Sequence, residues 1–342
     1  MLIKDLSNFA DKEVTLKGWV ANRRDGKGLV FIILRDGTGQ CQCIGDINKL
    51  GEERFNAASS LGLESSVILT GTVVADERQI GGYELHISDI QVIQQVSDYP
   101  IAKKEHGVDF LMDKRHLWLR SNRQWAIMKI RNQIIFSIHN FFQKEGFVQM
   151  DAPIFTGNAC EGTSNLFETD YYGDPAYLSQ SGQLYGEAMA MAMGKIYTFG
   201  PTFRAEKSKT RRHLSEFWMI EPEMAFHDIF DNMDLIEGFL QYVLKDVLAN
   251  CKNELQIIER DTAVLESSLK PFPRLTYDEA VRIIKGEQDV NGQNSIKSLE
   301  DLLTSTQARL EALNTEIAER EEKLKTPGMK KGEINFNQTK II

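Results

Sequence analysis

The sequence has no long apolar run and little cysteine. No segment approaches the ~18 consecutive apolar residues that a membrane-spanning helix requires, so we do not expect a membrane protein. The N-terminal stretch MLIKDLSNFADKEV is interrupted by charges, unlike the apolar region of a secretory signal peptide, and we expect a cytoplasmic protein. The 342 residues include only 4 cysteines. Neither a CxxC pair nor a histidine cluster accompanies Cys41 and Cys43, so a zinc site is not expected.

An excess of positive charge is also missing. Lys and Arg total 40 against 49 Asp and Glu, which gives a formal net charge of −9. Many nucleic-acid-binding domains are basic, so this balance counts against such a partner. Basic residues nevertheless cluster at Arg23-Arg24, within residues 114–123 and within residues 207–212. Because an acidic protein can present local positive patches, the net charge does not exclude a nucleic acid.

Strand-like patterns dominate the first part of the chain. Five segments have the alternation or the short apolar run of a β-strand, and one helical segment near residues 49–60 interrupts them. Five short strands with one helix fit a small barrel of the oligonucleotide-binding (OB) type, which we expect over residues 1–100. The expected strands are residues 13–20, 29–34, 40–44, 66–74 and 83–93.

The middle of the chain mixes helices with shorter strand-like segments. A charged stretch predicts a linker over residues 101–120, and a second domain is expected over residues 121–290. The first long helix should end at Gly146, because glycine is common just after a helix. Helices and non-alternating strands in this mixture indicate an α+β fold. The expected helices are residues 123–144, 233–248 and 276–285.

The last part of the chain carries a heptad pattern. Apolar residues recur at a 3-then-4 spacing over residues 296–324, with Thr306 and Arg320 as polar exceptions. Pro327-Gly328 ends the pattern. We expect a coiled-coil-like helix that begins a helical hairpin insertion over residues 291–342. A helix that partners another subunit remains the alternative.

The strongest chemical signal lies in residues 202–223. Two strand-like ends flank a polar loop rich in cations. An arginine at the end of a strand, here Arg204, is suited to a phosphate because its planar fork binds two oxygens. Phe217 on the returning strand has the side chain to stack on a base. A solvated basic loop between two strands is the alternative that composition alone favours.

These segments together resemble the class II aminoacyl-tRNA synthetases. The core of their motif 2, Phe-Arg-x-Glu, matches Phe203-Arg204-Ala205-Glu206. Residues 123–153 resemble motif 1, a helix, strand and proline that build the dimer interface, so the resemblance implies a homodimer. Residues 18–25 and 30–33 resemble the anticodon-binding barrel of the aspartyl, asparaginyl and lysyl subgroup. The resemblance thus implies an antiparallel-sheet catalytic core with flanking helices after the barrel.

The resemblance implies an ATP site in motif 2. Arg204 would hold the α-phosphate of ATP, and Glu206 would contact the adenine or the 3′ end of tRNA. Phe217 would stack on the adenine, while Arg212 and His213 match loop positions near the outer phosphates. The chemistry needs positioning and charge neutralisation rather than a protein nucleophile, because the carboxylate of the amino acid attacks phosphorus.

The resemblance also implies an asparagine pocket. Glu161 matches the residue that pairs with the substrate ammonium, and Ser181 and Gln183 match neighbouring polar positions. Aspartyl enzymes place a lysine three residues after that glutamine, where this sequence has Gly186. Glu221 would accept a hydrogen bond from an amide NH₂ and repel a second carboxylate. The pocket is therefore expected to select L-asparagine over aspartate.

In the barrel, the resemblance implies contacts with the tRNA anticodon. Phe31 matches the aromatic residue that stacks on the central anticodon base. Arg24 and Gln42 match neighbouring anticodon contacts, and Glu84 matches a position that reads the first anticodon base. A place for Phe31 in the barrel core is the alternative.

The implied reaction is the ATP- and Mg²⁺-dependent activation of L-asparagine and its transfer to tRNA(Asn). Motif 3 and the acidic magnesium ligands of the family have no match after Phe226, so we expect no metal ligand in this chain. We also expect the chain as written to be a truncated, inactive piece of a synthetase. The alternatives are a non-catalytic tRNA-binding paralogue, an aspartyl-tRNA synthetase and a relative of asparagine synthetase. The complete barrel argues against the last of these.

Overall fold

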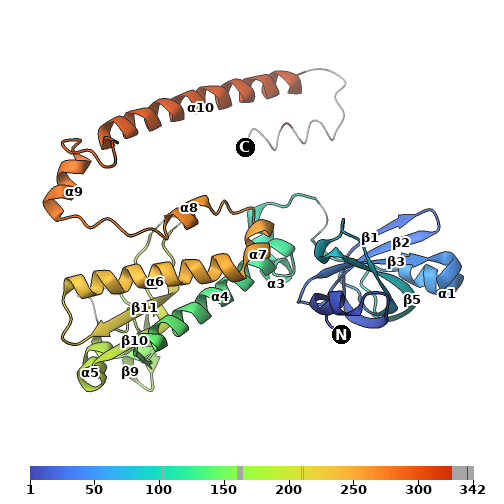
Figure 1. Ribbon diagram of the computed structural model, residues 1–342, viewed down its shortest axis with the longest axis horizontal. Coiled ribbons are helices and arrows are strands. Elements are labelled where there is room, and N and C mark those ends of the chain that lie inside the picture. The colour runs from blue at the N-terminus through green and yellow to red at the C-terminus, as the bar shows by residue number, and fades with distance from the viewer. Residues whose placement is uncertain (102–103, 160–164, 209, 211, 326–336, 338–342) are drawn as a thin grey trace. The chain divides into compact units, whose positions relative to one another are not determined.

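A computed structural model describes residues 1–101, 104–159, 165–208, 210, 212–325 and 337 of the chain. The chain divides into two compact units, Met1–Met128 and Lys129–Ile342 (Figure 1). The finer domain boundaries expected at residues 100, 120 and 290 stay predictions. Among the described residues, no helix has the length and apolar character to cross a membrane.

The first unit is built on a closed five-stranded barrel with the order β1-β2-β3-β5-β4. Strand β1 pairs with β4 along its first half and with β2 along its second half, and Trp19 has a partner in each. This confirms the OB-type barrel. Its elements are the 3₁₀ helix η1 (Ile3–Phe9), β1 (Glu13–Gly26), β2 (Leu29–Arg35), β3 (Gln40–Asp46), α1 (Ile47–Ser60), β4 (Ser66–Ala75), the 3₁₀ helix η2 (Ile80–Gly82) and β5 (Tyr83–Gln94).

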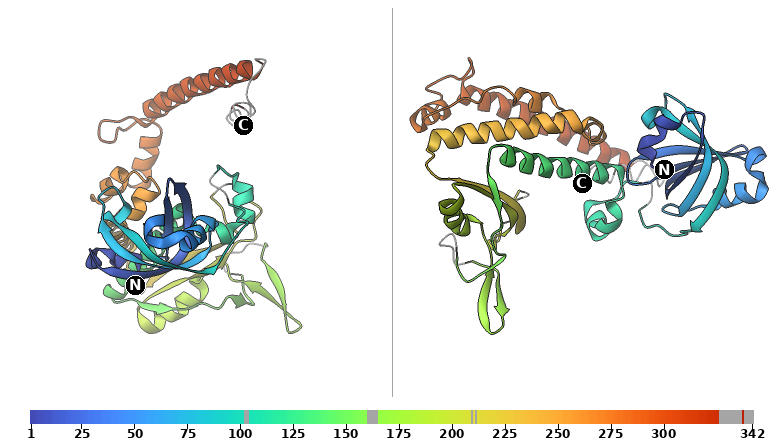
Figure 2. Two further views of the ribbon diagram at one scale, coloured as in Figure 1. Left: turned by 90° about the vertical axis from the view of Figure 1, so that its right-hand side faces the viewer. Right: turned by 60° about the horizontal axis from the view of Figure 1, so that its bottom comes forward.

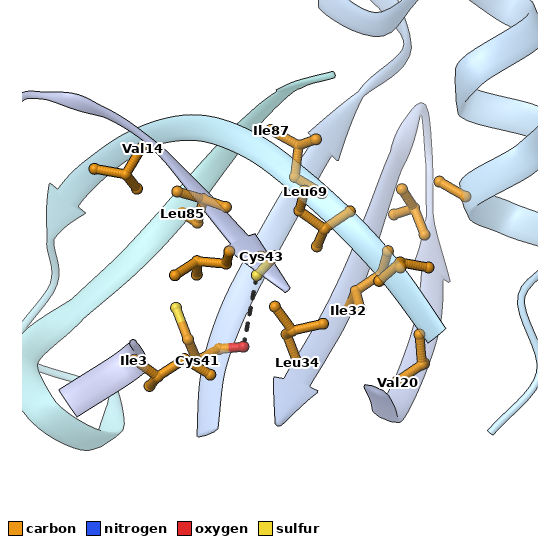
Figure 3. Packing of buried hydrophobic residues seen from close by; sticks show 14 of the residues in the cluster. Ile3, Val14, Val20, Ile32, Leu34, Cys41, Cys43, Leu69, Leu85 and Ile87 are labelled. Atoms are coloured by element: carbon orange, nitrogen blue, oxygen red, sulfur yellow. Dashed lines mark hydrogen bonds between the residues drawn. The ribbon is translucent and has the colours of Figure 1, made fainter. Parts of the chain in front are cut away.

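The barrel encloses its own apolar core. Every second residue of β2 and β3 is buried, including Ile32, Leu34 and Cys43, as expected for strands with one face toward a core. Leu69 of β4 meets them inside the barrel (Figure 3). Cys41 and Cys43 are free and buried, and burial raises the pKa of the Cys43 thiol well above its usual value. The intervening residues of the same strands point outward.

The segment expected as a linker carries two short helices, α2 (Val108–Asp113) and α3 (Arg115–Trp118). The buried carboxylate of Glu64 links the end of this segment to the barrel. Arg35 and Arg120 each donate a hydrogen bond to Glu64 Oε2 at 2.9 Å, and Arg35 Nη1 donates to the carbonyl of Arg120 at 2.7 Å. The C-terminal end of the segment is therefore held against the barrel.

The second unit contains a three-stranded sheet with the order β11-β10-β6, covered on one face by two long helices (Figure 1). The strands β10 and β11 are antiparallel, whereas β6 pairs with β10 in parallel. A smaller sheet has the order β7-β9-β8. The elements are α4 (Asn122–Lys144), β6 (Val148–Met150), β7 (Phe155–Thr156), β8 (Glu168–Tyr171), β9 (Asp174–Leu178), α5 (Gln183–Met193), β10 (Lys195–Phe203), β11 (Glu216–Met224) and α6 (Ile229–Asn250).

Aromatic side chains fix α4 and α6 to the sheet. The ring of Phe142 on α4 stacks on that of Tyr197 on β10, with centroids 4.7 Å apart, and its centroid lies 5.2 Å from that of Phe239 on α6. Because alternate residues of a strand face opposite sides, the residues next to Tyr197 point away from these helices. The opposite face carries α5, since Gly186 lies against Ile196 and Glu223 there (Figure 2).

After α6, the described residues form the helices α7 (Lys252–Ile257), α8 (Ala263–Ser267), α9 (Tyr277–Ile284) and α10 (Ser295–Leu324). The heptad pattern is thus confirmed as a single 30-residue helix. Within the described residues no side chain of α10 is buried, and Leu310 is 58% exposed. Arg320 donates a hydrogen bond to Asn337 at 3.3 Å. The remainder of the expected hairpin lies outside the described residues, and both readings of this helix stay predictions.

Candidate active site and nucleic-acid interface

The antiparallel pair β10 and β11 brings the motif 2 residues together. Thr202 pairs with Phe217, and the backbone N–H of Arg204 donates to the carbonyl of Ser215 at 2.9 Å. This bond closes the base of the loop that joins the strands. Since alternate residues share a face, Phe217 lies on the same side of the sheet as Thr202, the side turned away from α4 and α6.

A cleft of about 710 Å³ opens over this strand pair. Its lining includes all five residues expected at the ATP site: Arg204, Glu206, Arg212, His213 and Phe217. Two guanidinium groups, which bind phosphate oxygens, thus share a cleft with an aromatic ring that a base can stack on. The residues that line the cleft fit a nucleoside triphosphate. The roles of the individual residues stay predictions.

A second cleft, of about 230 Å³, lies where β10 and β11 meet the start of α5. Ser181, Gly182, Thr198 and Glu221 are among its lining residues. Gln183 is exposed in the first turn of α5 and is not among the described residues that line this cleft. The expected ammonium partner, Glu161, lies outside the described residues.

The carboxylate of Glu221 is held from two directions. Ser181 Oγ donates to Glu221 Oε2, and the backbone N–H of Gly182 donates to Glu221 Oε1, each at 2.9 Å. Ser181 Oγ in turn accepts a hydrogen bond from the backbone N–H of Gln183 at 2.9 Å. A carboxylate with both oxygens bound in this way is fixed as an acceptor facing the cleft.

Position 186, where aspartyl enzymes have a lysine, is buried in this chain. A Cβ placed on Gly186 would lie 3.4 Å from Glu223 Cγ and 3.5 Å from Ile196 Cδ1, so the helix packs closely on the sheet there. Burial, followed by the charges of Glu221 and Glu187, raises the pKa of Glu223 above its usual value. Three acidic side chains, Glu187, Glu221 and Glu223, thus interact near position 186, and a further carboxylate beside them would be disfavoured.

The outer face of the barrel brings together the four residues expected to read an anticodon. The guanidinium of Arg24 on β1 lies 4.4 Å from the ring centre of Phe31 on β2, with which it is paired. Gln42 on β3 pairs with Glu84 on β5 and donates to Glu84 Oε2 at 3.0 Å. Phe31 is half-buried on the outer face, since its neighbours Val30 and Ile32 fill the core. The alternative prediction, that Phe31 lies in the barrel core, is therefore wrong.

Three residues at these sites were not predicted from the sequence. His86 contacts Glu84 on the barrel face, with His86 Nε2 2.8 Å from Glu84 Oε1. Gly182 and Thr198 line the smaller cleft. An alternating strand places His86 on the same face as Glu84, so that signal was available. In the described part of the chain, no group of three His, Cys, Asp or Glu residues is arranged to hold a metal ion.

Comparisons with known proteins identify the family of the chain. Residues 107–336 match the family of class II tRNA synthetases (D, K and N), and residues 14–93 match the OB-fold nucleic acid binding domain. The chain is 54% identical over 281 residues to an asparagine–tRNA ligase of Symbiobacterium thermophilum, covering 82% of this chain and 64% of that protein. A second such ligase, from Koribacter versatilis, is 52% identical over 286 residues, covering 83% and 65%. The chain thus spans less than two thirds of the length of either relative.

Solved structures of asparaginyl-tRNA synthetases also superpose on this chain. The asparaginyl-tRNA synthetase of Pyrococcus horikoshii complexed with asparaginyl-adenylate superposes with a TM-score of 0.79 at 38% identity, over 86% of this chain and 68% of that chain. The Entamoeba histolytica enzyme in complex with the same adenylate gives a TM-score of 0.69 at 26% identity, over 85% and 68%. The OB-type barrel, the clefts on the strand pair and these matches lead to one conclusion: the chain belongs to the class II tRNA synthetases of the D, K and N group.

Proposed function

We propose that this chain serves the ATP-dependent charging of tRNA(Asn) with L-asparagine, in the cytoplasm. The observation that carries the proposal is the carboxylate of Glu221, which is fixed as a hydrogen-bond acceptor facing the smaller cleft. Position 186, where the resemblance led us to look for a lysine, is a glycine packed on the sheet and supplies no cation. An amide side chain can donate to this acceptor, whereas a carboxylate cannot. The asparagine–tRNA ligases at 52–54% identity support the same substrate.

In the proposed reaction, the carboxylate of asparagine attacks the α-phosphorus of ATP. A bond forms between that oxygen and phosphorus, and the bond to the leaving pyrophosphate breaks, giving asparaginyl-adenylate. Arg204 would neutralise the α-phosphate and Phe217 would hold the adenine by stacking, since both line the larger cleft. A terminal hydroxyl of tRNA(Asn) then attacks the carbonyl carbon and displaces AMP. We propose Mg²⁺ as the counter-ion of ATP, and assign no ligand for it among the described residues.

Binding of adenylate analogues to residues 1–342 tests this function without requiring turnover. Isothermal titration with the asparaginyl and aspartyl sulfamoyl-adenosines should show a strong preference for the asparaginyl compound, on the order of 10⁴. Equal affinity for the two compounds would remove asparagine as the substrate. Failure to bind either compound, together with intact tRNA binding, would favour the second candidate, a tRNA-binding module without catalysis, which the closed barrel supports.

We also propose that two copies of the chain associate through the motif 1 region. Large apolar side chains remain exposed there, among them Phe136 on α4 at 58% and Val148 on β6 at 42%. Exposed apolar side chains gathered on neighbouring elements mark protein interfaces. Sedimentation velocity should therefore give a dimer, and Phe136→Asp should give a monomer. A monomeric wild-type chain would contradict this proposal.

A further inference from the structure

We propose that His86 is a positioning residue that orients the carboxylate of Glu84 to read a guanine in the bound RNA. The inference rests on the proposed function, because it concerns how the barrel face recognises the anticodon. It is carried by three side chains on two neighbouring strands. Gln42 Nε2 lies 3.0 Å from Glu84 Oε2, and His86 Nε2 lies 2.8 Å from Glu84 Oε1.

The surroundings of Glu84 are those of a prepared acceptor. Its side chain is only 9% exposed, although it belongs to the outward-facing row of β5, whereas His86 is 39% exposed. Gln42 and His86 contact the carboxylate on its two oxygens. An ionised carboxylate has no hydrogen to donate, so His86 must carry its proton on Nε2 at this contact. Each Glu84 oxygen thus receives one hydrogen bond and keeps capacity for another.

A fixed carboxylate that can accept one more hydrogen bond on each oxygen suits a ligand with two adjacent donors. On its Watson–Crick edge, guanine presents N1–H beside the N2 amino group. Adenine, cytosine and uracil each place an acceptor next to their donor. Single-stranded bases are read on these edges once they are unstacked. The Glu84 carboxylate, a few residues across the sheet from the Arg24–Phe31 pair, therefore suits a guanine that lies next to a base stacked on Phe31.

His86 matters because a two-point contact tolerates little rotation of the carboxylate. Without the imidazole, Glu84 Oε1 would lose its protein partner while Gln42 still held Oε2. The carboxylate could then turn about its last torsion, and one of the two contacts with guanine would be lost. A binding group that must be ordered by its ligand gives up affinity, whereas a preorganised group does not.

The test measures the preference for guanine over inosine, which lacks the N2 amino group. Fluorescence polarisation with residues 1–342 would compare two RNA stem-loops, one with the anticodon GUU and one with inosine in its first position. The wild-type chain should prefer guanine about tenfold, the usual effect of one hydrogen bond to a charged group. His86→Leu should reduce the preference to about threefold or less, without changing affinity for the inosine loop. His86→Gln, which restores an N–H donor, should keep it.

A control variant separates positioning from folding. Ser88→Ala changes a polar residue of the same strand whose hydroxyl bonds to Glu13 and to the carbonyl of Thr70, and it should keep the guanine preference. A preference that survives His86→Leu would overturn the inference, as would an equal loss of affinity for both loops. If the wild-type chain bound the GUU loop no better than a loop with an unrelated anticodon, the proposed function itself would fail.

Discussion

Ser181 Oγ donates a hydrogen bond to Glu221 Oε2 at 2.9 Å, joining the turn before α5 to the middle of β11. With the N–H of Gly182 on the other oxygen, the carboxylate is oriented before any substrate arrives. Preorganised groups lose little freedom on binding and so discriminate well. The pair therefore explains how one acidic side chain could distinguish an amide from a carboxylate.

Replacing the charge of Glu221 should weaken that distinction. Glu221→Gln keeps the shape of the side chain but brings an NH₂ group toward the donors Ser181 and Gly182. We expect the ratio of affinities for the asparaginyl and aspartyl adenylate analogues to fall by about tenfold or more, as measured by calorimetry. Glu216→Gln makes the same chemical change on an exposed residue of the same strand and should leave the ratio unchanged.

Phe31 should contribute to RNA affinity through its ring. Because the ring lies on the outer face beneath Arg24, Phe31→Ala should weaken binding of a GUU stem-loop by about 1–3 kcal/mol without unfolding the barrel. Filter binding provides the measurement. Ile93→Ala, at a residue of β5 that is 57% exposed, is the matched control and should have no effect. Equal affinity of Phe31→Ala and the wild-type chain would rule out stacking on this ring.

Gly182 should tolerate no side chain while Thr198 is present. Its φ of −82° is open to alanine, yet a Cβ there would lie 2.5 Å from Thr198 Oγ1. We expect Gly182→Ala to destabilise the second unit by about 1–3 kcal/mol through overpacking. Thr198→Ala removes the clashing oxygen, so the double variant should regain part of that loss. Scanning calorimetry of the four chains gives the coupling, and strictly additive effects would show that the contact is unimportant.

Truncation of two leucines should lower the free energy of unfolding by very different amounts. Leu69 is fully buried in the barrel, so Leu69→Ala should cost about 2–5 kcal/mol of unfolding free energy. Leu310 on α10 is 58% exposed, and Leu310→Ala should change stability by no more than ~0.5 kcal/mol. Urea unfolding monitored by tryptophan fluorescence compares the two. A large cost at Leu310 would instead mean that another helix covers the heptad stripe.

The barrel was accessible from the sequence because its signals are local. The alternation around Val30, Ile32 and Leu34 directs these side chains inward, which also directs Phe31 outward. The lengths of the strands were underestimated, most clearly for β1, which runs to Gly26. The extension, residues 22–26, is formed by pairing with β2, and the alternation of apolar residues in β1 has already ended there.

The fine structure of the sites was not accessible in the same way. The contact of Gln42 with Glu84 requires the parallel pairing of β3 with β5, which are separated along the chain by α1, β4 and η2. The grip of Ser181 on Glu221 likewise depends on how α5 packs on the sheet. The resemblance predicted roles for Gln42, Glu84, Ser181 and Glu221 but not the contacts among them. Only the fold reveals that Ser181 holds Glu221.

Because β1 pairs with β4, and β5 joins β3 to β4, we expect the barrel to form late during synthesis. Glu13 must meet Thr72, and β3 and β4 gain their shared neighbour only when β5 is available through Gln94. Pairings between residues so distant along the chain form slowly, because a long loop must close before any contact compensates. Protease resistance of ribosome-stalled chains is therefore expected to appear only after Gln94 has cleared the exit tunnel. Until then, we expect the apolar strands of the nascent chain to stay exposed.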